Sequence, residues 1–525
     1  MKLFTTSGSL RLLSALLLSI PAAGTLKADV SNTITGVGAF AFNTTGFDNT
    51  ADGYNTLRMN TTGYGNSAVG ARSLNVNTSG IENSAFGSYS LYSNTTGYQN
   101  TALGYSALAN NTNGGVNTAV GYDALVGNTT GSYNTSTGAY TLYTNTTGSQ
   151  NTSNGYYALQ ANTTGYANTG LGSFSLSFNT TGYDNTAVGS YALNANTTGQ
   201  RNVAIGNNAL LANTTGQFNV AAGWGALVNN TSGKDNVAYG YDAMSYNTTG
   251  YNNAALGEAA MYQNTTGYAN TATGFHSLYS NSSGHYNLSS GYYALAQNTT
   301  GSYNVGEGLQ ALASNSDGNR NTSTGAYSLS HNTTGNYNVA FGYNAGAALT
   351  TGDFNIAIGN LGTKTDTATI RLGTQGTQTK AFVAGIFGTT ASAGVPVYVT
   401  STGQLGTLTS SAKFKQNIHS MASASDALLA LRPVTYQYKS EIDPNGTPQF
   451  GLIAEEVEKV SPDLVVHDAD QQIYTVRYEA VNAMLLNEFQ KQHETIASQE
   501  KVIAQQQKLL QALSARLDRV EKSVK

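Results

Sequence analysis

The chain has 525 residues and no cysteine, and only 10% of its residues are charged, with a net charge of −4, where a typical soluble protein has about 25%. The missing cysteine excludes a disulfide scaffold, a zinc ribbon and thiol catalysis. The near-neutral balance argues against a nucleic-acid partner, which would need a basic face. The 59 glycines come with only 6 prolines and no three-residue period, so the chain is not a collagen.

The N-terminus has the pattern of an export signal. Lys2 and Arg11 precede a short apolar run, residues 12–20, which is followed by proline and small residues at 21–24. This order is typical of a secretory signal peptide over residues 1–24, and the run is shorter than the about 20 apolar residues of a membrane span. We therefore expect a secreted or cell-surface protein with no transmembrane anchor in the mature chain.

One repeat fills the body of the chain. An Asn-Thr-Thr-Gly motif or a close variant recurs every 17 residues, from Asn43 to Asn332, so that 18 copies cover residues 43–348 without an insertion. Numbered from this Asn, positions 4 and 11 are always Gly, position 7 is always Asn, position 14 is Ala, Ser or Thr, and position 15 is Leu in nearly every copy. So strict a period indicates similar units stacked on one another.

Each unit is too short and too rich in glycine for a helical hairpin. It can hold two or three short strands, joined by Asn-x-x-Gly turns that supply positive-φ residues. The sequence therefore predicts a mainly β protein: a cap at residues 25–42, then a β-solenoid or β-roll rod over residues 43–352, about 85 Å long at about 4.8 Å per rung. Stacked Asn side chains can form hydrogen-bonded ladders. The thin interior, one Leu and a few Ala per rung, would gain from packing against other chains.

Rungs such as residues 202–206 (Asn-Val-Ala-Ile-Gly) and 355–359 resemble those of trimeric autotransporter adhesin heads. The resemblance implies left-handed β-rolls assembled as trimers, although those heads usually repeat in a shorter unit, which leaves handedness and strand number open. Tyrosines at positions 5 and 12 form either packing ladders or a surface for a glycan or another cell-surface ligand. Calcium-binding β-rolls need an aspartate on each turn, and this body has too few, so we expect no metal and no cofactor.

A connector at residues 353–409 follows the rod. Residues 381–388 and 395–399 are predicted to be strands and residues 401–406 a turn, because apolar and β-branched residues there alternate with turn residues. The connector is thus expected to be a β-rich neck. The connector ends where the density of charged residues rises: residues 410–525 contain 28 charged residues, whereas residues 43–348 contain 15.

The charged tail carries a second resemblance. Residues 410–418 (Ser-Ser-Ala-Lys-Phe-Lys-Gln-Asn-Ile) are followed by three characteristic segments, at residues 427–438, 450–457 and 476–478. In this order they are similar to the C-terminal intramolecular chaperone domain of phage tailspikes and endosialidases. The resemblance covers residues 410–525 and implies a small α+β domain that clamps three chains together and then cuts itself off.

Carried onto this sequence, the family's motif makes Ser410 the nucleophile and Lys415 its partner, with Lys413 at the basic position. Ser411 stands where the family usually has Asp. A serine hydroxyl needs a base, and lysine serves as one only when neutral; burial in an assembled trimer would disfavour the ammonium form. The resemblance thus implies a single-turnover serine peptidase that cuts at about Thr409–Ser410, with a cut one bond later as the alternative.

A heptad pattern runs from residue 478 to the end of the chain. Its positions are Phe489, Ile496, Ile503, Leu510, Leu517 and Val524 at a, and Gln492, Gln499, Gln506, Leu513 and Val520 at d. This pattern predicts a coiled coil. A single amphipathic helix folded back on its own domain is the alternative.

Together these features predict a secreted, adhesin-like homotrimeric fibre whose tail is a self-cleaving trimerisation chaperone. The alternatives are a phage-type tail fibre for host recognition, which would need no export signal, and a polysaccharide-degrading tailspike enzyme. Glycoside hydrolysis needs paired carboxylates, and in the body only Asp48 and Asp52 lie close in sequence. We therefore expect no substrate enzyme activity in the rod.

Overall fold

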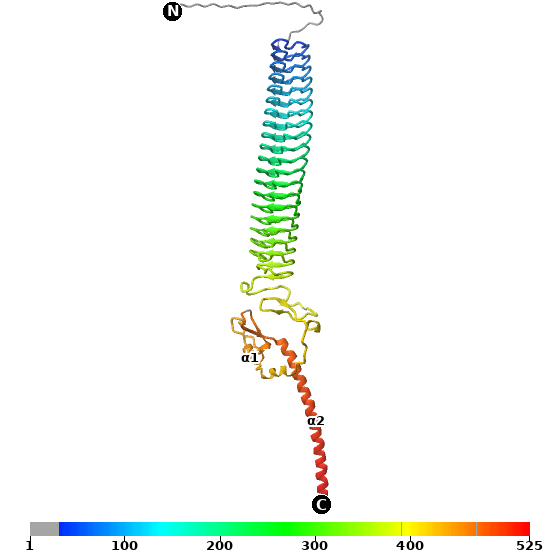
Figure 1. Ribbon diagram of the computed structural model, residues 1–525, viewed down its shortest axis with the longest axis vertical. Helices are drawn as coiled ribbons and strands as arrows, with labels where there is room; N and C mark the ends of the chain where they lie inside the picture. Colours follow the sequence, from blue (N-terminus) through cyan, green and yellow to red (C-terminus); the bar gives the residue numbers. More distant parts are fainter. Residues whose placement is uncertain (1–30, 390, 469, 525) are drawn as a thin grey trace, which may run out of the picture. The chain divides into compact units, whose positions relative to one another are not determined.

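The computed structural model describes residues 31–389, 391–468 and 470–524. The chain divides into two compact units, Met1–Thr374 and Gln375–Lys525, of which the first contains the repeats and the second the tail (Figure 1). The predicted signal peptide, residues 1–24, lies outside the described residues.

The first unit is a stack of rungs, each contributing one strand to a 21-stranded parallel sheet (Figure 1). Successive strands pair in register one repeat apart, so that Thr186 lies beside Val203 and Val203 beside Val220. The strands are β1 (Thr33–Thr35), β2 (Thr50–Asp52), β3 (Ser67–Val69), β4 (Ser84–Phe86), β5 (Thr101–Leu103), β6 (Thr118–Val120), β7 (Thr135–Thr137), β8 (Thr152–Asn154), β9 (Thr169–Leu171), β10 (Thr186–Val188), β11 (Val203–Ile205), β12 (Val220–Ala222), β13 (Val237–Tyr239), β14 (Ala254–Leu256), β15 (Thr271–Thr273), β16 (Leu288–Ser290), β17 (Val305–Glu307), β18 (Thr322–Thr324), β19 (Val339–Phe341), β20 (Ile356–Ile358) and β21 (Ile370–Leu372). The predicted β-solenoid with one rung per repeat is confirmed.

Each rung contains one three-residue strand, where the sequence predicts two or three. The rest of the rung still bonds to its neighbour through the backbone, as when Leu210 N donates to Ala226 O (2.9 Å) and Thr214 N to Thr231 O (2.9 Å). These segments do not continue as strands because the chain repeatedly visits positive φ, at positions 6, 13 and 15 of the repeat.

The two invariant glycines of a rung have different roles. Gly206, at position 11, has a φ of +128°, and a Cβ there would lie 2.5 Å from Gly223 O. Gly199, at position 4, is outside the positive-φ region, but a Cβ there would collide with Asn196 Oδ1 and Gly216 O. The prediction that the Asn-x-x-Gly turn uses positive φ is therefore wrong: its glycine is required by the close approach of the next rung.

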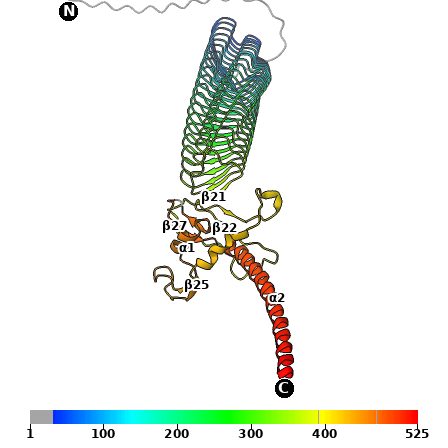
Figure 2. The same cartoon turned by 60° about the horizontal axis from the view of Figure 1, so that its bottom comes forward.

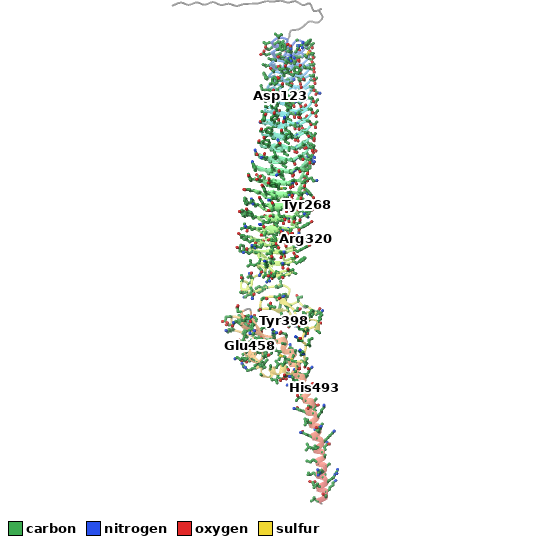
Figure 3. All side chains as sticks on the ribbon, in the orientation of Figure 1. Asp123, Tyr268, Arg320, Tyr398, Glu458 and His493 are labelled. Atoms are coloured by element: carbon green, nitrogen blue, oxygen red, sulfur yellow. The ribbon has the colours of Figure 1, made fainter. Side chains whose placement is uncertain are left out.

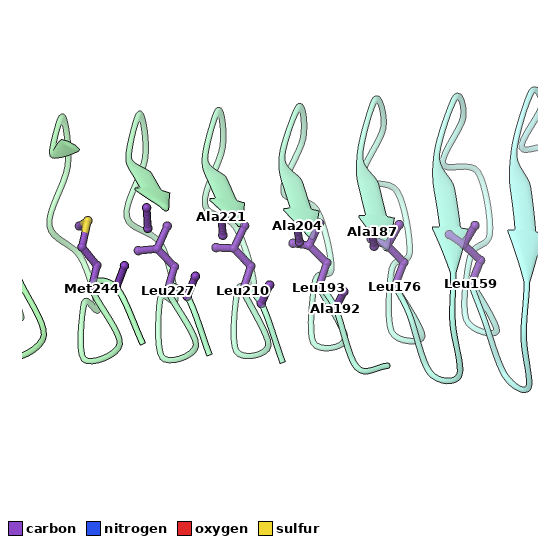
Figure 4. Close-up of a cluster of buried hydrophobic side chains, with 14 of the residues drawn as sticks. Leu159, Leu176, Ala187, Ala192, Leu193, Ala204, Leu210, Ala221, Leu227 and Met244 are labelled. Carbon is purple, nitrogen blue, oxygen red and sulfur yellow. The ribbon is translucent and has the colours of Figure 1, made fainter. Parts of the chain in front are cut away.

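The interior of the rod is closed within one chain. Figure 4 shows the position-15 side chains of successive rungs stacked inside the coil; Leu193, Leu210 and the position-9 Ala204 have no exposed surface. The leucines have φ near +50°, which costs a side chain roughly 1–2 kcal/mol. Full burial of a leucine, worth about 1.5–3 kcal/mol, offsets that strain. A rung therefore covers its leucine core within one chain, and packing of the rod against other chains stays a prediction.

Two buried asparagine ladders run along the rod, as predicted. At position 1, Asn213 Nδ2 donates to Asn196 Oδ1 of the preceding rung (2.8 Å). At position 7, Asn219 donates to Asn202 Oδ1 from both its backbone N (3.0 Å) and its Nδ2 (3.2 Å). Because these amides are buried, each ladder satisfies polar groups that water cannot reach.

Aromatic residues form ladders on the outside of the rod. Tyr251 and Tyr268 at position 5 stack with ring centroids 4.9 Å apart and planes inclined by 3°, and Tyr140 and Tyr157 at position 13 stack at 5.0 Å and 8° (Figure 3 labels Tyr268). In this arrangement each ring covers the face of the next, so that the edges point outward. The rings act as packing ladders along the stack.

An ion pair closes the C-terminal end of the rod. Arg371 on β21 pairs with the inward-facing Ala357 of β20, and its Nε and Nη2 donate to the Asp366 carboxylate at 2.5 and 2.7 Å. Thr363 donates to the same carboxylate from its backbone N and its hydroxyl. The Arg371 hydrogen bonds hold the pKa of Asp366 down at about 2, so the carboxylate stays ionised at neutral pH at the end of the stack.

The second unit is a small α+β domain followed by a long helix (Figure 2). Its elements are β22 (Tyr398–Val399), β23 (Leu405–Gly406), η1 (Ala412–Phe414), η2 (Ala422–Ala430), β24 (Val434–Tyr436), β25 (Gln449–Gly451), α1 (Ala454–Val460), η3 (Pro462–Leu464), β26 (Val465–His467), β27 (Ile473–Val476) and α2 (Tyr478–Val524). Its core comprises Val457, Leu464, Val465, Val476 and Met484. Beyond His493, α2 continues with no other element of this unit alongside it (Figure 3).

The predicted C-terminal helix is confirmed, whereas the connector is less regular than predicted. Residues 381–388 form turns and irregular backbone, and of residues 395–399 only Tyr398 and Val399 form a strand, which pairs antiparallel with β23 around the predicted turn. A strand needs a partner for its backbone groups, and within one chain residues 381–388 have no paired strand. No helix in the described part of the chain is long and apolar enough to cross a membrane.

Candidate functional site

Ser410 and Lys415 flank a single 3-10 turn, η1. Phe414 N donates to Ser411 O (3.0 Å) and Lys415 N to Ala412 O (3.1 Å), so the chain folds back on itself within five residues. The turn places Lys415 Nζ 3.1 Å from Ser410 Oγ. The structure thus brings the two sequence-predicted site residues within hydrogen-bonding distance of each other.

The surroundings of this pair are open to solvent. Ser410, Lys415 and the preceding Thr409 are all exposed in the single chain. Lys415 Nζ donates to the serine hydroxyl, whereas a general base must accept the hydroxyl proton. One chain therefore brings a nucleophile and its partner together in an exposed setting.

The second lysine of the motif is oriented differently. Lys413 Nζ lies 4.7 Å from the centroid of the Phe414 ring, a cation–π contact. Lys413 and Lys415 are thus close in sequence but have different partners. This difference makes Lys413 a matched control for Lys415.

A second serine–lysine pair, with no signal in the sequence, joins η2 to α2. Lys491 Nζ lies 2.9 Å from the buried Ser425 Oγ and within 2.6 Å of both Asp426 Oδ1 and Glu488 Oε1. Its hydrogen bonds to Asp426 and then Glu488 raise the pKa of Lys491, so it stays an ammonium. This cluster fastens η2 to the helix and does not have the chemistry of a base.

Other contacts link the three segments that carry the sequence resemblance. Arg432 of the first segment donates to both carboxylate oxygens of Glu456 in the second, at 2.5 and 3.1 Å, and this contact lowers the pKa of Glu456. Leu452 N, also in the second segment, donates to Tyr478 Oη of the third (2.9 Å). Segments separated in sequence are therefore parts of one folded unit.

A groove of mixed lining runs between η2 and the start of α2. It has a volume of about 570 Å³ and is lined by the apolar Leu428, Leu429, Leu485, Leu486 and Phe489 and the polar Asn482, Glu488 and Gln492. Leu429 and Phe489 are 73% and 70% exposed. Among the residues that the structure describes, no three histidine, aspartate or glutamate side chains gather in a way that could hold a metal ion.

Comparison with protein-family models matches residues 410–466 to the family described as Chaperone of endosialidase. The match begins at Ser410, includes η1, η2 and α1, and ends within β26, before α2. Neither a search of curated proteins nor a search of solved structures gave a match. The chain therefore joins a repetitive β-solenoid rod to a C-terminal domain that, over residues 410–466, is similar to the Chaperone of endosialidase family of intramolecular chaperones.

Proposed function

We propose that this protein is an exported, adhesin-like trimeric fibre whose C-terminal domain assembles three chains and then removes itself by cutting between Thr409 and Ser410. The observation that carries the proposal is the 3.1 Å approach of Lys415 Nζ to Ser410 Oγ, in a segment similar to Chaperone of endosialidase. Ser411 in place of the family's usual Asp remains compatible with this geometry, because the pair forms without it.

The cut follows from the chemistry of these groups. Neutral Lys415 accepts the Ser410 Oγ proton while Oγ attacks the Thr409 carbonyl carbon. The Thr409–Ser410 amide bond breaks, its nitrogen takes the proton from Lys415 and becomes the amine of Ser410, and an ester joins Thr409 to Oγ. One water molecule then hydrolyses the ester, which leaves a Thr409 carboxylate and a free Ser410 hydroxyl.

Assembly is supported by the apolar stripe of α2. Phe489, Ile496, Ile503 and Leu510 follow one another at heptad spacing and are 52–70% exposed in the single chain, which is typical of helices that pack against other helices. The groove beside Phe489 continues this surface toward η2. Burying Lys415 on assembly would favour its neutral form, so the cut waits until the trimer exists.

The test compares four variants of the mature chain, residues 25–525. Ser410→Ala and Lys415→Ala should remain intact on a denaturing gel. The parent and the controls Ser411→Ala and Lys413→Ala should release a 116-residue fragment, residues 410–525, whose first residue is Ser410. An intact parent in a sample shown to be trimeric would contradict self-cleavage and leave the chaperone role standing.

The chaperone role and export are tested separately. Denatured Ser410→Ala protein should refold to trimers, whereas a chain ending at Thr409 should not, because it lacks α2. Equal recovery of trimers from both would contradict the chaperone role. Recovery of the mature chain outside the producing cells, and its loss when residues 2–24 are deleted, tests export.

A further inference from the structure

We infer that the apolar side chains of the connector form an interchain lock: they pack against the same residues of two other copies and hold the rods together after the C-terminal domain has left. The inference rests on the proposed function and extends it, because it names the segment that keeps the cut fibre assembled. The lock residues are Phe382, Val383, Ile386, Phe387, Val395, Val397, Val399, Leu405 and Leu408.

These side chains have no core in a single chain. Phe387 is 101% exposed and Phe382 91%, and the other lock residues are 62–69% exposed. Among the described residues from 380 to 409, only Tyr398 is even half-buried. Water thus surrounds almost the whole apolar content of the segment, in contrast to the closed interior of the rod.

The exposed area is large enough for a stable association. Nine such side chains expose on the order of 1,000 Å² per chain, since an aromatic side chain alone can bury about 150–250 Å². A standard stable interface takes about 800 Å² from each partner. Exposed apolar surface of this extent marks an interaction site, and it is concentrated in a short stretch of the chain.

The backbone of residues 395–399 could also pair with the same segment of a second copy. Val395, Val397 and Val399 alternate in the way that strands do, yet among the described residues from 375 to 409 strand pairing is confined to β22 with β23. Identical segments from neighbouring chains can pair their free backbone groups and bury their valines in the same step. A second copy is therefore the occupant that suits both the side chains and the backbone.

The outward face of the rod is a weaker candidate for this lock. Its strands present position 10 to solvent, where Leu103 and Ile205 are 50% and 48% exposed. The same row includes Asp52, Asn154 and Glu307. In a symmetric assembly each residue would face its own copies, so the acidic positions would repel one another.

The position of the connector completes the inference. The proposed cut follows Leu408 by one residue, so the lock stays with the rods. The apolar stripe of α2 leaves with the released fragment and cannot hold the cut fibre. Whatever maintains the trimer after cutting must lie before Ser410, and the connector is where unburied apolar surface is concentrated.

The test uses the mature chain with Ser410→Ala and with a protease recognition sequence inserted after Thr409, so that the cut does not depend on self-cleavage. Phe382→Ser combined with Phe387→Ser disrupts the lock. Leu103→Ser combined with Ile205→Ser, on the rod, is the matched control. The molar mass of each sample is measured by light scattering at micromolar concentration, before and after cutting.

All samples should be trimers before the cut. After it, rods of the parent and the control should stay trimeric, and rods of the lock variant should separate into monomers. Lock-variant rods that stay trimeric, or parent rods that separate, would overturn the inference. A parent that is monomeric before the cut would instead refute the proposed trimer, so the two failures are distinguishable.

A milder change keeps the test sensitive. Val397→Thr preserves shape and strand preference but places a hydroxyl in the lock. It should lower the denaturant concentration at which cut parent trimers dissociate, whereas the same change at the exposed rod residue Val237 should not. Equal midpoints for the Val397 variant and the parent would count against the lock.

Discussion

Asn202→Leu tests whether the buried ladders hold the rod together. Asn202 Oδ1 accepts from Asn219 N and Nδ2 at 3.0 and 3.2 Å, and its Nδ2 donates to Asn185 Oδ1 at 3.1 Å and to Gly216 O at 2.9 Å. Leucine preserves the volume and removes all four bonds. Gly216 O keeps a donor in Asn213 Nδ2, whereas the buried Asn219 N loses its side-chain acceptor.

The expected cost follows from this count. Each hydrogen bond contributes about 0.5–1.5 kcal/mol net, and a buried donor without an acceptor costs about 1–3 kcal/mol, so the variant should lose on the order of 4 kcal/mol. A stacked repeat expresses such a loss near the altered rung, because each rung contacts only its neighbours. An opening free energy lower by that amount speeds exchange about 1,000-fold.

Hydrogen exchange followed by mass spectrometry measures this effect peptide by peptide. Peptides that span residues 196–223 should exchange about 1,000-fold faster in the variant, and peptides from residues 60–94 should exchange as in the parent. Thr198→Val, at an exposed position four residues earlier, is the control and should change neither. Exchange around residue 202 within tenfold of the parent would refute the claim that the ladder stabilises the rung.

Three further predictions concern ionisable groups. Lys415→Arg keeps a cation near Ser410, but a guanidinium does not act as a base, so the 116-residue fragment should be lost on gels while Lys413→Arg still releases it. Arg371→Ala should weaken the end of the rod by roughly 2 kcal/mol at neutral pH, since the ion pair holds the pKa of Asp366 at about 2, below the about 3.9 of an unfolded aspartate. Hydrogen exchange of residues 353–372 should differ between variant and parent above about pH 4, and the difference should vanish as the pH falls toward 2. A difference that does not depend on pH would contradict this prediction. Burial raises the pKa of Asp242, so ionising this carboxyl at a pH above the ordinary aspartate pKa opposes folding. The Asp242→Asn variant should therefore melt at a higher temperature than the parent at pH 7 and at the same temperature at pH 3. Equal melting temperatures at pH 7 would contradict this prediction.

Much of the rod can be predicted because its contacts repeat with the sequence period. Strict spacing fixes which residues stack, so the inward Leu210 and the ladder residue Asn202 follow from the pattern alone. The backbone conformation does not follow in the same way. Leu210 has φ of 52°, a left-handed conformation that leucine rarely adopts. Gly199 is required by its contact with the next rung, and the local Asn-x-x-Gly sequence does not reveal that contact.

The tail is predictable only where its contacts are local. Ser410 and Lys415 meet across one turn, so a five-residue spacing is enough to pair them. The pair Ser425 and Lys491 is equally close in space but 66 residues apart in sequence, and no short motif records it. The sequence predicts a strand at residues 381–388, but these residues form turns and irregular backbone, because no strand of the described chain pairs with them.

The rod, the connector and α2 differ in how far each buries its apolar side chains within one chain. This difference gives an order for the steps of the proposed assembly. The rod buries its leucines within one chain and closes its end with Asp366 and Arg371. The connector and the apolar stripe of α2 both leave large apolar side chains in water. The α2 helix forms from contacts within its own segment, so its apolar stripe exists before the chains meet. Strand pairing between connectors must order both partners in the same step in which it brings them together.

On the proposals above, association of the helices would therefore come first and hold three connectors near one another, at an effective concentration far above that of free chains. Packing of the connectors then buries Leu408, two residues before Ser410. If assembly also buries the segment around Ser410, it would favour the neutral form of Lys415. The proposed cut would then follow the packing of the connectors, which take over the role of the helices in holding the chains together.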